Sequence, residues 1–439
     1  MKSKRFWIAL FVFSLIGQIA WVVENMYFNV FIYHMFNASQ SDIALMVQAS
    51  AVAATLTTLF VGAASDRLGK RKAFITVGYL LWGVSILCFA VLRVDWIAKL
   101  FPAAAQGAAK AAAIGVTLVI VFDCVMTFFG SSANDACFNA WLTDSTDETN
   151  RGKAEGINAM MPLMAILVVF GGTMWIDKKN PAHWTILFIA IGAIVLVSGA
   201  LGFFLIDETA KPEPQPDGYF RTLFYGFRPR VMRENPDLYL ALICFTIFGI
   251  SIQVYMPYLI LYYTEALHLD NYVLIMAPAI ILAAIATAFY GRLYDKLGYR
   301  KTLIPALLVL LLGYAVLFLF RHTALVFLGS LLMMCGYLCG MAVFGARIRD
   351  CTPIGMAGRF QGLRIIAQVL IPGVIGPEIG ELVLKGAETV LNDDGTYSFI
   401  PNANIFLWAG IVLLPIAIVI GIELSRTHKS GAGITVQTK

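Results

Sequence analysis

The sequence has little charge for its length. Only 13% of its 439 residues are Asp, Glu, Lys or Arg, about half the share found in soluble proteins. Apolar residues make up 59%, and the mean hydropathy is +0.77. A soluble domain of this size needs more charge to cover its surface. The composition therefore excludes soluble enzymes, nucleic-acid-binding proteins and disordered chains, and it favours a protein with several membrane spans.

The sequence also lacks the motifs of catalysis and of metal binding. It contains no Walker A loop, no His-Glu-x-x-His motif and no nucleophile elbow. Cys335 and Cys339 are four residues apart, but no histidine or second cysteine pair accompanies them as a zinc site requires. We therefore expect no enzyme activity, no cofactor, no metal site and no disulfide framework.

Twelve apolar runs are long enough to cross about 30 Å of hydrocarbon as helices. They cover residues 6–34, 41–64, 73–92, 113–142, 154–176, 183–206, 238–264, 271–291, 302–320, 324–346, 360–386 and 402–425. The first run is too long for a signal peptide and lacks a cleavage site, so we expect it to be retained. The sequence thus predicts an all-α membrane protein with twelve transmembrane helices.

The distribution of Lys and Arg predicts the orientation of these helices. With both termini in the cytoplasm, the inside segments hold 25 of the 32 basic residues and the outside loops hold seven. Cytoplasmic loops carry such an excess, so we expect both termini to be cytoplasmic. Short loops and tails favour the bacterial inner (plasma) membrane. We expect a monomer in the lipid bilayer with no nucleic-acid partner.

The longest predicted cytoplasmic connection lies near the middle of the chain. Residues 207–237 contain five prolines, and aromatic and basic residues lie between the third and the fourth of them, a pattern typical of an extended piece and a short helix on the membrane surface. We interpret this connection as a linker between two bundles of six helices. The predicted boundaries are 1–206 for the N-terminal bundle, 207–237 for the linker, 238–426 for the C-terminal bundle and 427–439 for a cytoplasmic tail.

Two pairs of loops indicate an internal duplication. The segment Gly62–Lys72 matches Gly291–Lys301 at an offset of 229 residues, each between the second and third helix of its half. The segment Asp144–Gly156 matches Asp350–Gly362 after the fourth helix of each half. Repeats in the same order and orientation predict two parallel halves that enclose a cavity and expose it to each side in turn. The duplication therefore predicts a carrier.

The doubled Gly-x-x-x-Asp-[Arg/Lys]-x-Gly loop resembles the major facilitator superfamily over essentially the whole chain. Within it, residues 21–33 and 142–152 resemble the glycoside–pentoside–hexuronide:cation symporters and the related sucrose carriers. The resemblance implies that the loop acids bond between the halves and latch an inner gate. The residues that match this role, or that we expect to act with it, are Asp66, Arg67, Arg71, Arg151, Asp295, Lys296, Arg300 and Arg364. A role only in fixing topology through positive charge is the alternative.

Ionisable groups inside predicted spans are candidates for coupling because a charge there is costly. Glu24, Asp123 and Asp135 lie in the first half, and their aligned positions in the second half carry no acid. Burial disfavours the charged carboxylate, so such a group takes up a proton, or its oxygens bind sodium. Residues 43–64 contain no acid, which departs from the symporter pattern and favours proton coupling or none. The alternative is bonding between helices.

Aromatic and amide side chains near these acids suggest a sugar site, because aromatic faces stack on sugar rings and amides bond hydroxyl groups. The predicted substrate-binding residues are Gln18, Trp21, Asn25, Phe28, Gln253, Tyr258 and Gln368. Aromatic belts at the membrane interface are the alternative reading. We therefore expect a secondary transporter of a small solute, a sugar or glycoside, driven by a proton or sodium. A carrier for a lysophospholipid or drug-like amphiphile is the second hypothesis.

Overall fold

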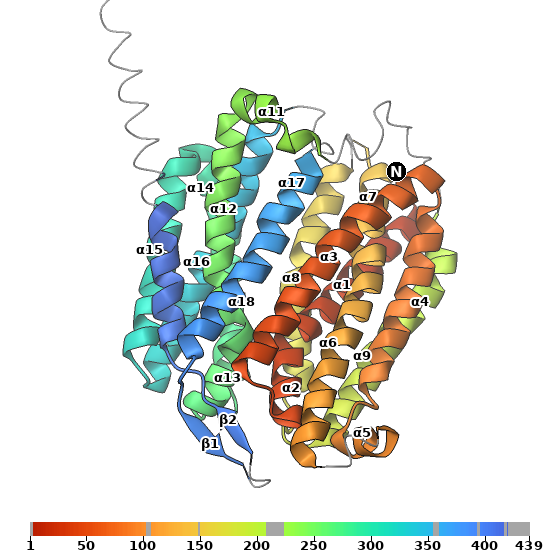
Figure 1. Ribbon diagram of the computed structural model, residues 1–439. Helices are drawn as coiled ribbons and strands as arrows, with labels where there is room; N and C mark the ends of the chain where they lie inside the picture. The colour runs from red at the N-terminus through yellow and green to blue at the C-terminus, as the bar shows by residue number, and fades with distance from the viewer. Residues whose placement is uncertain are drawn as a thin grey trace, which may run out of the picture. The chain divides into compact units, whose positions relative to one another are not determined.

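The computed structural model describes residues 3–101, 107–147, 150–207, 224–353, 360–392, 396–416 and 419. Within them, eleven helices are long and apolar enough to cross a membrane, and a shorter apolar helix, Asn404–Ile416, follows (Figure 1). The eleven are Lys4–Phe36, Gln40–Ser65, Arg71–Phe89, Lys110–Asp144, Lys153–Thr173, Pro181–Leu205, Pro236–Ala266, Val273–Leu297, Tyr299–Leu319, Thr323–Cys351 and Gly362–Leu384. These twelve helices coincide with the twelve apolar runs, so the predicted all-α fold with twelve transmembrane helices is confirmed.

The first six spans are built from ten helical elements. These elements are α1 (Lys4–Val22), η1 (Val23–Tyr27), α2 (Phe28–Phe36), α3 (Gln40–Leu68), α4 (Arg71–Phe89), α6 (Ala108–Gly130), η3 (Ser131–Phe138), α7 (Asn139–Asp144), α8 (Arg151–Thr173) and α9 (Pro181–Leu205). A further short helix, α5 (Val94–Leu100), lies in the connection between the third and fourth spans. Gly69 ends α3 with a φ of 62°, a left-handed conformation that glycine adopts without steric cost.

The remaining spans contain more interruptions. The elements are η4 (Tyr225–Phe227), α11 (Pro229–Glu234), α12 (Pro236–Tyr255), η5 (Met256–Tyr258), α13 (Leu259–Leu261), η6 (Tyr262–Ala266), α14 (Val273–Leu297), α15 (Tyr299–Leu319), α16 (Thr323–Cys351), α17 (Gln361–Ile365), η8 (Ile366–Leu370) and α18 (Ile371–Leu384). A hairpin of β1 (Thr389–Leu391) and β2 (Tyr397–Phe399) follows, with Val390 paired to Ser398. The sequence analysis did not predict this hairpin.

Four spans contain a π-helical segment, in which backbone hydrogen bonds join residues five apart. They are η1, η3, η6 and η8, in the first, fourth, seventh and eleventh spans. A π-helical turn inserts one residue and rotates the side chains that follow it, and such turns are frequent at functional sites. Glu24 lies in η1 and Asp135 lies in η3. Two of the three predicted coupling acids therefore sit on irregular turns.

The chain forms two compact units whose boundaries differ from those of the repeat. Unit 1 comprises residues 1–222, 256–277 and 384–402, and unit 2 comprises residues 223–255, 278–383 and 403–439. Two segments that follow the linker in sequence, the end of the seventh span and the hairpin, thus pack with the first six spans. The predicted domain boundaries stay a prediction.

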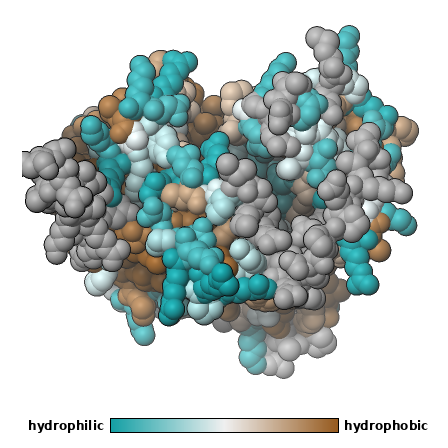
Figure 2. All heavy atoms as spheres, turned by 90° about the horizontal axis from the view of Figure 1, so that it is seen from above, coloured by the Kyte–Doolittle hydropathy of each residue, from teal (hydrophilic) through white to brown (hydrophobic). Residues whose placement is uncertain are grey.

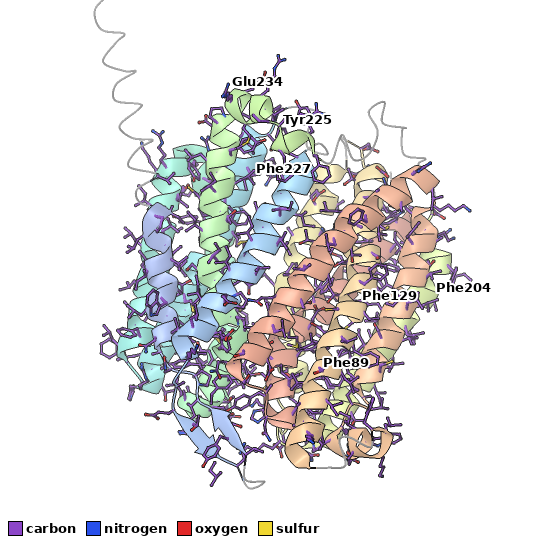
Figure 3. The ribbon with its side chains drawn as sticks, in the orientation of Figure 1. Phe89, Phe129, Phe204, Tyr225, Phe227 and Glu234 are labelled. Carbon is purple, nitrogen blue, oxygen red and sulfur yellow. The ribbon has the colours of Figure 1, made fainter. Side chains whose placement is uncertain are left out.

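Part of the predicted linker lies within the described residues. From residue 224 onward it forms η4 and the short helix α11, which contains Arg230 and Arg233. Phe220 and Arg221 lie outside the described residues, and the predicted position of this connection on the membrane surface stays a prediction. Tyr225 and Phe227 are drawn near Glu234 in Figure 3, and the ring of Tyr225 lies 5.8 Å from the ring of Phe360. Aromatic contacts therefore hold this connection against the start of the eleventh span in unit 2.

The connections between helices are more polar than the sides of the helices. Figure 2 looks onto the face that bears the N-terminus, and hydrophilic side chains are spread over it. Exposed basic residues near helix ends include Arg67 and Lys153 in unit 1 and Arg230 and Lys296 in unit 2. By contrast, Phe204 projects from the side of α9 and is 73% exposed (Figure 3). This distribution fits helices whose sides contact lipid and whose ends contact water.

Close contact between α4 and α9 depends on small residues. A Cβ atom at Gly83 would lie 2.7 Å from the backbone nitrogen of Leu196 and 2.9 Å from the carbonyl oxygen of Gly192. Membrane helices gain stability from such close backbone approach, because lipid supplies no hydrophobic drive for their association. Glycine at position 83 therefore sets the separation of the two helices.

We expect Gly83→Ala to lower the stability of the folded protein, because the added methyl group would overlap the backbone of α9. Overpacking of this kind costs about 1–3 kcal/mol. Gly171→Ala is a matched control, since no atom lies within 4 Å of the Cβ position in α8 and alanine favours a helix over glycine. Thermal unfolding of both purified variants in detergent measures the difference. Equal melting temperatures would refute this account of the interface.

Candidate functional site

Glu24 is buried at the centre of a hydroxyl-lined cluster in unit 1. Its side chain, on η1, is only 7% exposed. Ser50 on α3 and Thr127 on α6 both donate hydrogen bonds to Glu24 Oε1 at 2.8 Å, and the two hydroxyl oxygens are 2.8 Å apart. Three spans thus contribute to one carboxylate. Glu24 Oε2 is buried and has no hydrogen-bond partner among the described residues.

Asp123 is the second acid of this cluster. It is 2% exposed and lies one turn before Thr127 on α6, whose hydroxyl group bonds Glu24. Asp123 Oδ1 is buried without a partner in the described part of the chain. Two carboxylates buried in one cluster repel each other when both are charged. The first, second and fourth spans thus bring two acids and two hydroxyl groups together.

Asp135 belongs to a neighbouring polar group on the same span. Its Oδ2 accepts a hydrogen bond from Ser131 at 3.0 Å and its Oδ1 accepts one from Asn134 at 3.3 Å. Tyr79 on α4 donates to Asn134 Oδ1 at 2.9 Å. A Cβ atom at Gly17 would lie 2.4 Å from that oxygen, so glycine at this position allows α1 to approach η3. Both oxygens of Asp135 thus accept a hydrogen bond, whereas Glu24 Oε2 and Asp123 Oδ1 accept none from the described residues.

A stripe of polar residues on the fourth span forms a buried face. Asp123, Thr127, Ser131 and Asn134 are each at most 3% exposed. Thr127 bonds Glu24, and Asn134 bonds Tyr79. The stripe therefore connects the fourth span to the first and the third through hydrogen bonds, which is the interhelical role that the sequence left as an alternative. That role and cation binding are compatible, because two carboxylate oxygens have no partner among the described residues.

The predicted substrate residues of the first span divide into two groups. Gln18 and Trp21 are half-buried, and Asn25 is exposed and donates to the carbonyl oxygen of Trp21 at 2.8 Å. The Trp21 ring lies 5.1 Å from the Trp82 ring.

Phe28, in contrast, is 1% exposed. Its ring packs between those of Phe89 and Phe188, at distances of 4.6 and 5.5 Å, and Figure 3 labels Phe89 in this cluster. Phe28 therefore acts in packing, and we do not include it in the site proposed below.

The three predicted substrate residues of the second half also differ in exposure. Gln253 and Gln368 are half-buried in unit 2. Tyr258 belongs to unit 1, where it is fully buried and donates a hydrogen bond to the carbonyl oxygen of Gln40 at 3.0 Å. Its hydroxyl group is thus already occupied, so Tyr258 is also left out of the proposed site.

The loop after the second span forms an ion pair within unit 1. Arg71 is 7% exposed, and its Nε lies 2.6 Å from Asp144 Oδ2 on α7. The sequence analysis placed Arg71 among the gating residues but did not identify Asp144 as its partner. Arg67 is exposed. The side chains of Asp66 and Arg151 lie outside the described residues, so the latch predicted for Asp66 stays a prediction.

The equivalent loop in unit 2 uses a different bond. Asp350, which aligns with Asp144, accepts a hydrogen bond from the hydroxyl group of Tyr294 at 2.6 Å. Asp295 and Lys296 are exposed, and Arg300 is half-buried. The two duplicated loops are therefore similar in sequence but form different contacts.

Arg364, the last predicted gating residue, lies on α17. It is half-buried, and its Nε has no partner among the described residues. Its role stays a prediction, as do those of Asp295, Lys296 and Arg300.

The end of unit 1 opposite the N-terminus contains a second cluster, built around Tyr272. The hydroxyl group of Tyr27 lies 2.9 Å from that of Tyr272 and also contacts Thr173. The ammonium group of Lys178 lies 5.2 Å from the centre of the Tyr272 ring. Burial lowers the pKa of Lys178, partly opposed by Asp270, and burial raises the pKa of Tyr272. These contacts join the first span to the segment that precedes α14.

Ser50 and Asp144 are the residues of these clusters that sequence reasoning missed. Ser50 lies in a run of small residues that carries no distinguishing pattern. Asp144 had a usable signal, because Arg71 and Asp144 recur as Arg300 and Asp350 in the second half of the repeat. A search for charge pairs that recur together in both halves would have found it.

Comparison with known proteins gives one family and several structures. The model of the Major Facilitator Superfamily matches residues 6–377. A mutant of the nucleoside transporter NupG has a TM-score of 0.70 and 12% identity, with 94% of this chain and 98% of that chain covered. A bacterial homolog of the human lysosomal transporter Spinster, inward-facing and occupied, has a TM-score of 0.69 and 15% identity, covering 96% and 97%. The xylose transporter XylE from E. coli has a TM-score of 0.61 and 14% identity, covering 94% and 96%. Comparison with the curated proteins gives no match.

We expect Arg71 and Asp144 to stabilise unit 1 as a pair. Arg71→Gln and Asp144→Asn should each lower the free energy of unfolding by about 2 kcal/mol, because each leaves a charged partner without its hydrogen bond. The double variant should lose less than the sum of the two single losses. Thermal or denaturant unfolding in detergent measures the coupling, and Arg67→Gln serves as the exposed control. Strictly additive losses would contradict the pairing.

Proposed function

The chain belongs to the major facilitator superfamily, and we propose that it is a secondary active transporter that moves a small sugar-like solute by alternating access, coupled to a proton. The observation that carries the proposal is the cluster of Glu24 and Asp123. Both carboxylates are buried in membrane spans, and each has an oxygen without a partner among the described residues. Ionisable groups in such positions are typical of ion pathways.

Coupling requires that the bound cation change the energy of the site. When Glu24 and Asp123 are both charged, their repulsion and their burial oppose the packing of the first and fourth spans. One proton on the pair removes one charge and supplies a hydroxyl donor that can satisfy an unpaired oxygen. A state that buries the pair is therefore favoured by protonation, which links proton binding to conformation. Asp135, with both oxygens bonded, is proposed as a supporting acid of this site.

Sodium is the alternative coupling ion. The oxygens of Glu24, Asp123, Ser50 and Thr127 are of the type that binds a hard cation. Among the described residues no group of three or more His, Cys, Asp or Glu side chains comes together as a metal site, so a sodium ion would depend on the two hydroxyl groups. A proton needs only one carboxylate. The structure named as a D-xylose–proton symporter adds support for the proton from a similar fold.

A hydroxylated ring is the proposed substrate. Xylose and nucleosides, named for two of the similar structures, both contain a ring that bears hydroxyl groups. Trp21 offers an aromatic face, and the amides of Gln18 and Asn25 lie within two turns of it on the same span. Gln253 and Gln368 are the amide candidates of unit 2. The competing hypothesis is an amphiphilic substrate. The uptake experiment tests the two hypotheses by comparing sugars, nucleosides and a lysophospholipid as substrates.

We expect Glu24→Gln and Asp123→Asn to abolish accumulation against a gradient, because each removes a carboxylate that takes the cation. Purified protein in proteoliposomes, supplied in turn with a pH gradient and a sodium gradient, measures uptake of labelled xylose, nucleosides and a lysophospholipid. Exchange of solute with no gradient should persist in both variants, since it needs binding but no coupling. Asp95→Asn, on the short helix α5, is the control.

Normal accumulation by both variants would refute the coupling site. If a sodium gradient alone drives accumulation, the coupling ion is sodium and not a proton, and the residues proposed for the site stay the same. Ser50→Ala is a further variant, because it removes a hydroxyl group that donates to Glu24 while it keeps the charges of both acids. We expect it to shift the pH at which uptake is half-maximal, an effect that a purely structural serine would not produce.

A further inference from the structure

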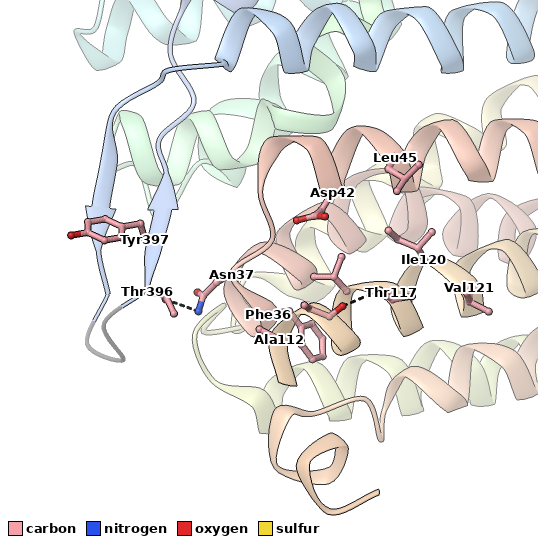
Figure 4. Close-up of a pocket in the computed structure, with 12 residues that line it drawn as sticks. Phe36, Asn37, Asp42, Leu45, Ala112, Thr117, Ile120, Val121, Thr396 and Tyr397 are labelled. Atoms are coloured by element: carbon pink, nitrogen blue, oxygen red, sulfur yellow. Dashed lines mark hydrogen bonds between the residues drawn. The ribbon is translucent and has the colours of Figure 1, made fainter. Parts of the chain in front are cut away.

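A groove opens on the side of unit 1, at the end opposite the N-terminus. It has a volume of about 440 Å³ and is lined by the end of α2, the start of α3, the second to fourth turns of α6 and the hairpin (Figure 4). Leu45 and Val121 in its wall are 52% and 54% exposed. Because α3 and α6 are membrane spans, these exposed apolar side chains face the acyl chains of the bilayer.

The groove changes from polar to apolar along the direction of the helices. Asn37, Asp42 and Thr396 lie at the helix ends, and Leu45, Ile120 and Val121 lie further along α3 and α6 (Figure 4). From the first to the last lining residue of α6, the helix rises about 14 Å. The hydrocarbon of one leaflet is about 15 Å deep, half the thickness of the core. The groove therefore matches one leaflet in depth and in polarity.

The floor and the rim of the groove are held in place by specific contacts. A Cβ atom at Gly115 would lie 2.2 Å from Phe36 Cδ1, so only glycine allows the Phe36 ring to pack onto α6. Asn37 donates a hydrogen bond to Thr396 Oγ1 at 2.8 Å, and Asn392 Nδ2 lies 3.1 Å from the same oxygen. The hairpin is thus fixed to the end of α2, and the rim is a built structure.

Asp42 gives the groove its charge. It is the one charged residue among those that line the groove in the described part of the chain. Its Oδ2 accepts hydrogen bonds from the backbone and hydroxyl groups of Ser39 at 2.8 and 2.7 Å, in a capping box that begins α3. Both of these bonds come from neutral groups and not from a basic side chain. A carboxylate at the rim attracts a cationic head group and repels an anionic one.

We propose that this groove binds a phospholipid with a primary-amine head group, from the leaflet at this end of unit 1. Its ammonium group donates to Asp42, its acyl chain lies along Leu45, Ile120 and Val121, and its polar backbone contacts the rim at Thr396. The bound lipid contacts α3, α6 and the hairpin together. It therefore stabilises the packing of the hairpin on the first two spans, independently of the solute and of the coupling ion.

The test compares three lipids added to the full-length protein in detergent. Dioleoylphosphatidylethanolamine, dioleoylphosphatidylcholine and dioleoylphosphatidylglycerol are added in turn, and native mass spectrometry counts the lipid retained while thermal unfolding measures stabilisation. We expect the ethanolamine lipid to be retained about tenfold more than the glycerol lipid. One charge-assisted hydrogen bond contributes about 1.5 kcal/mol, which corresponds to about a tenfold change in affinity. The choline lipid, which has no N–H donor, should fall between them.

Two variants identify the site. Asp42→Asn keeps an acceptor for the capping box but removes the charge, so it should abolish the preference for the amine lipid. Ala113→Phe fills the groove from an exposed position of α6 and keeps the charge, so it should lower retention of every lipid. Asp95→Asn is the control with an equal change of charge. Equal retention of the three lipids by the unaltered protein, or unchanged selectivity in Asp42→Asn, would overturn the proposal and indicate ordinary annular lipid.

Discussion

A charge inside a membrane span must be compensated within the protein, and this requirement governs the arrangement of unit 1. Glu24 and Asp123 are buried there, and two hydroxyl groups supply only part of the hydrogen bonding that their four oxygens require. Within the described residues the compensation is thus incomplete, which is why we propose that a cation completes it. A transporter can use this deficit, because the energy of the site then changes with the ion that occupies it. A site satisfied by protein groups alone, such as that of Asp135, has less to gain from an ion.

Close approach of helix backbones makes this arrangement possible. Gly17 admits Asn134 and Tyr79 against α1, and Gly130 admits the rings of Trp82 and Trp21 against α6. Because glycine has no side chain, polar groups of three spans meet where larger residues would separate them. The π-helical segments η1 and η3 add to this effect, since each rotates the residues that follow it. Polar contacts and irregular helix therefore occur together in unit 1.

The opposite end of unit 1 shows how the two halves of the sequence contribute to one unit. The hairpin and the segment around Tyr272 follow the linker in the chain, yet they bond to the first span through Tyr33, Asn37 and Tyr27. The groove next to the hairpin is formed by the same contacts. The proposed lipid site and the contacts of the hairpin therefore belong to the same surface of unit 1. This surface is separate from the buried acids Glu24 and Asp123.

Residue order alone was enough to predict the twelve spans, the duplicated loops and the three acids of the first half. The length of an apolar run and the presence of a charged residue inside it are local features of the chain. Both can therefore be recognised from the sequence alone. The three-dimensional arrangement was needed to show that Ser50 and Thr127 bond Glu24, that Arg71 pairs with Asp144, and that Phe28 is packed among rings. These contacts join residues on different helices. Their distances depend on helix rotation and on the close approach that glycine allows, which no local pattern specifies.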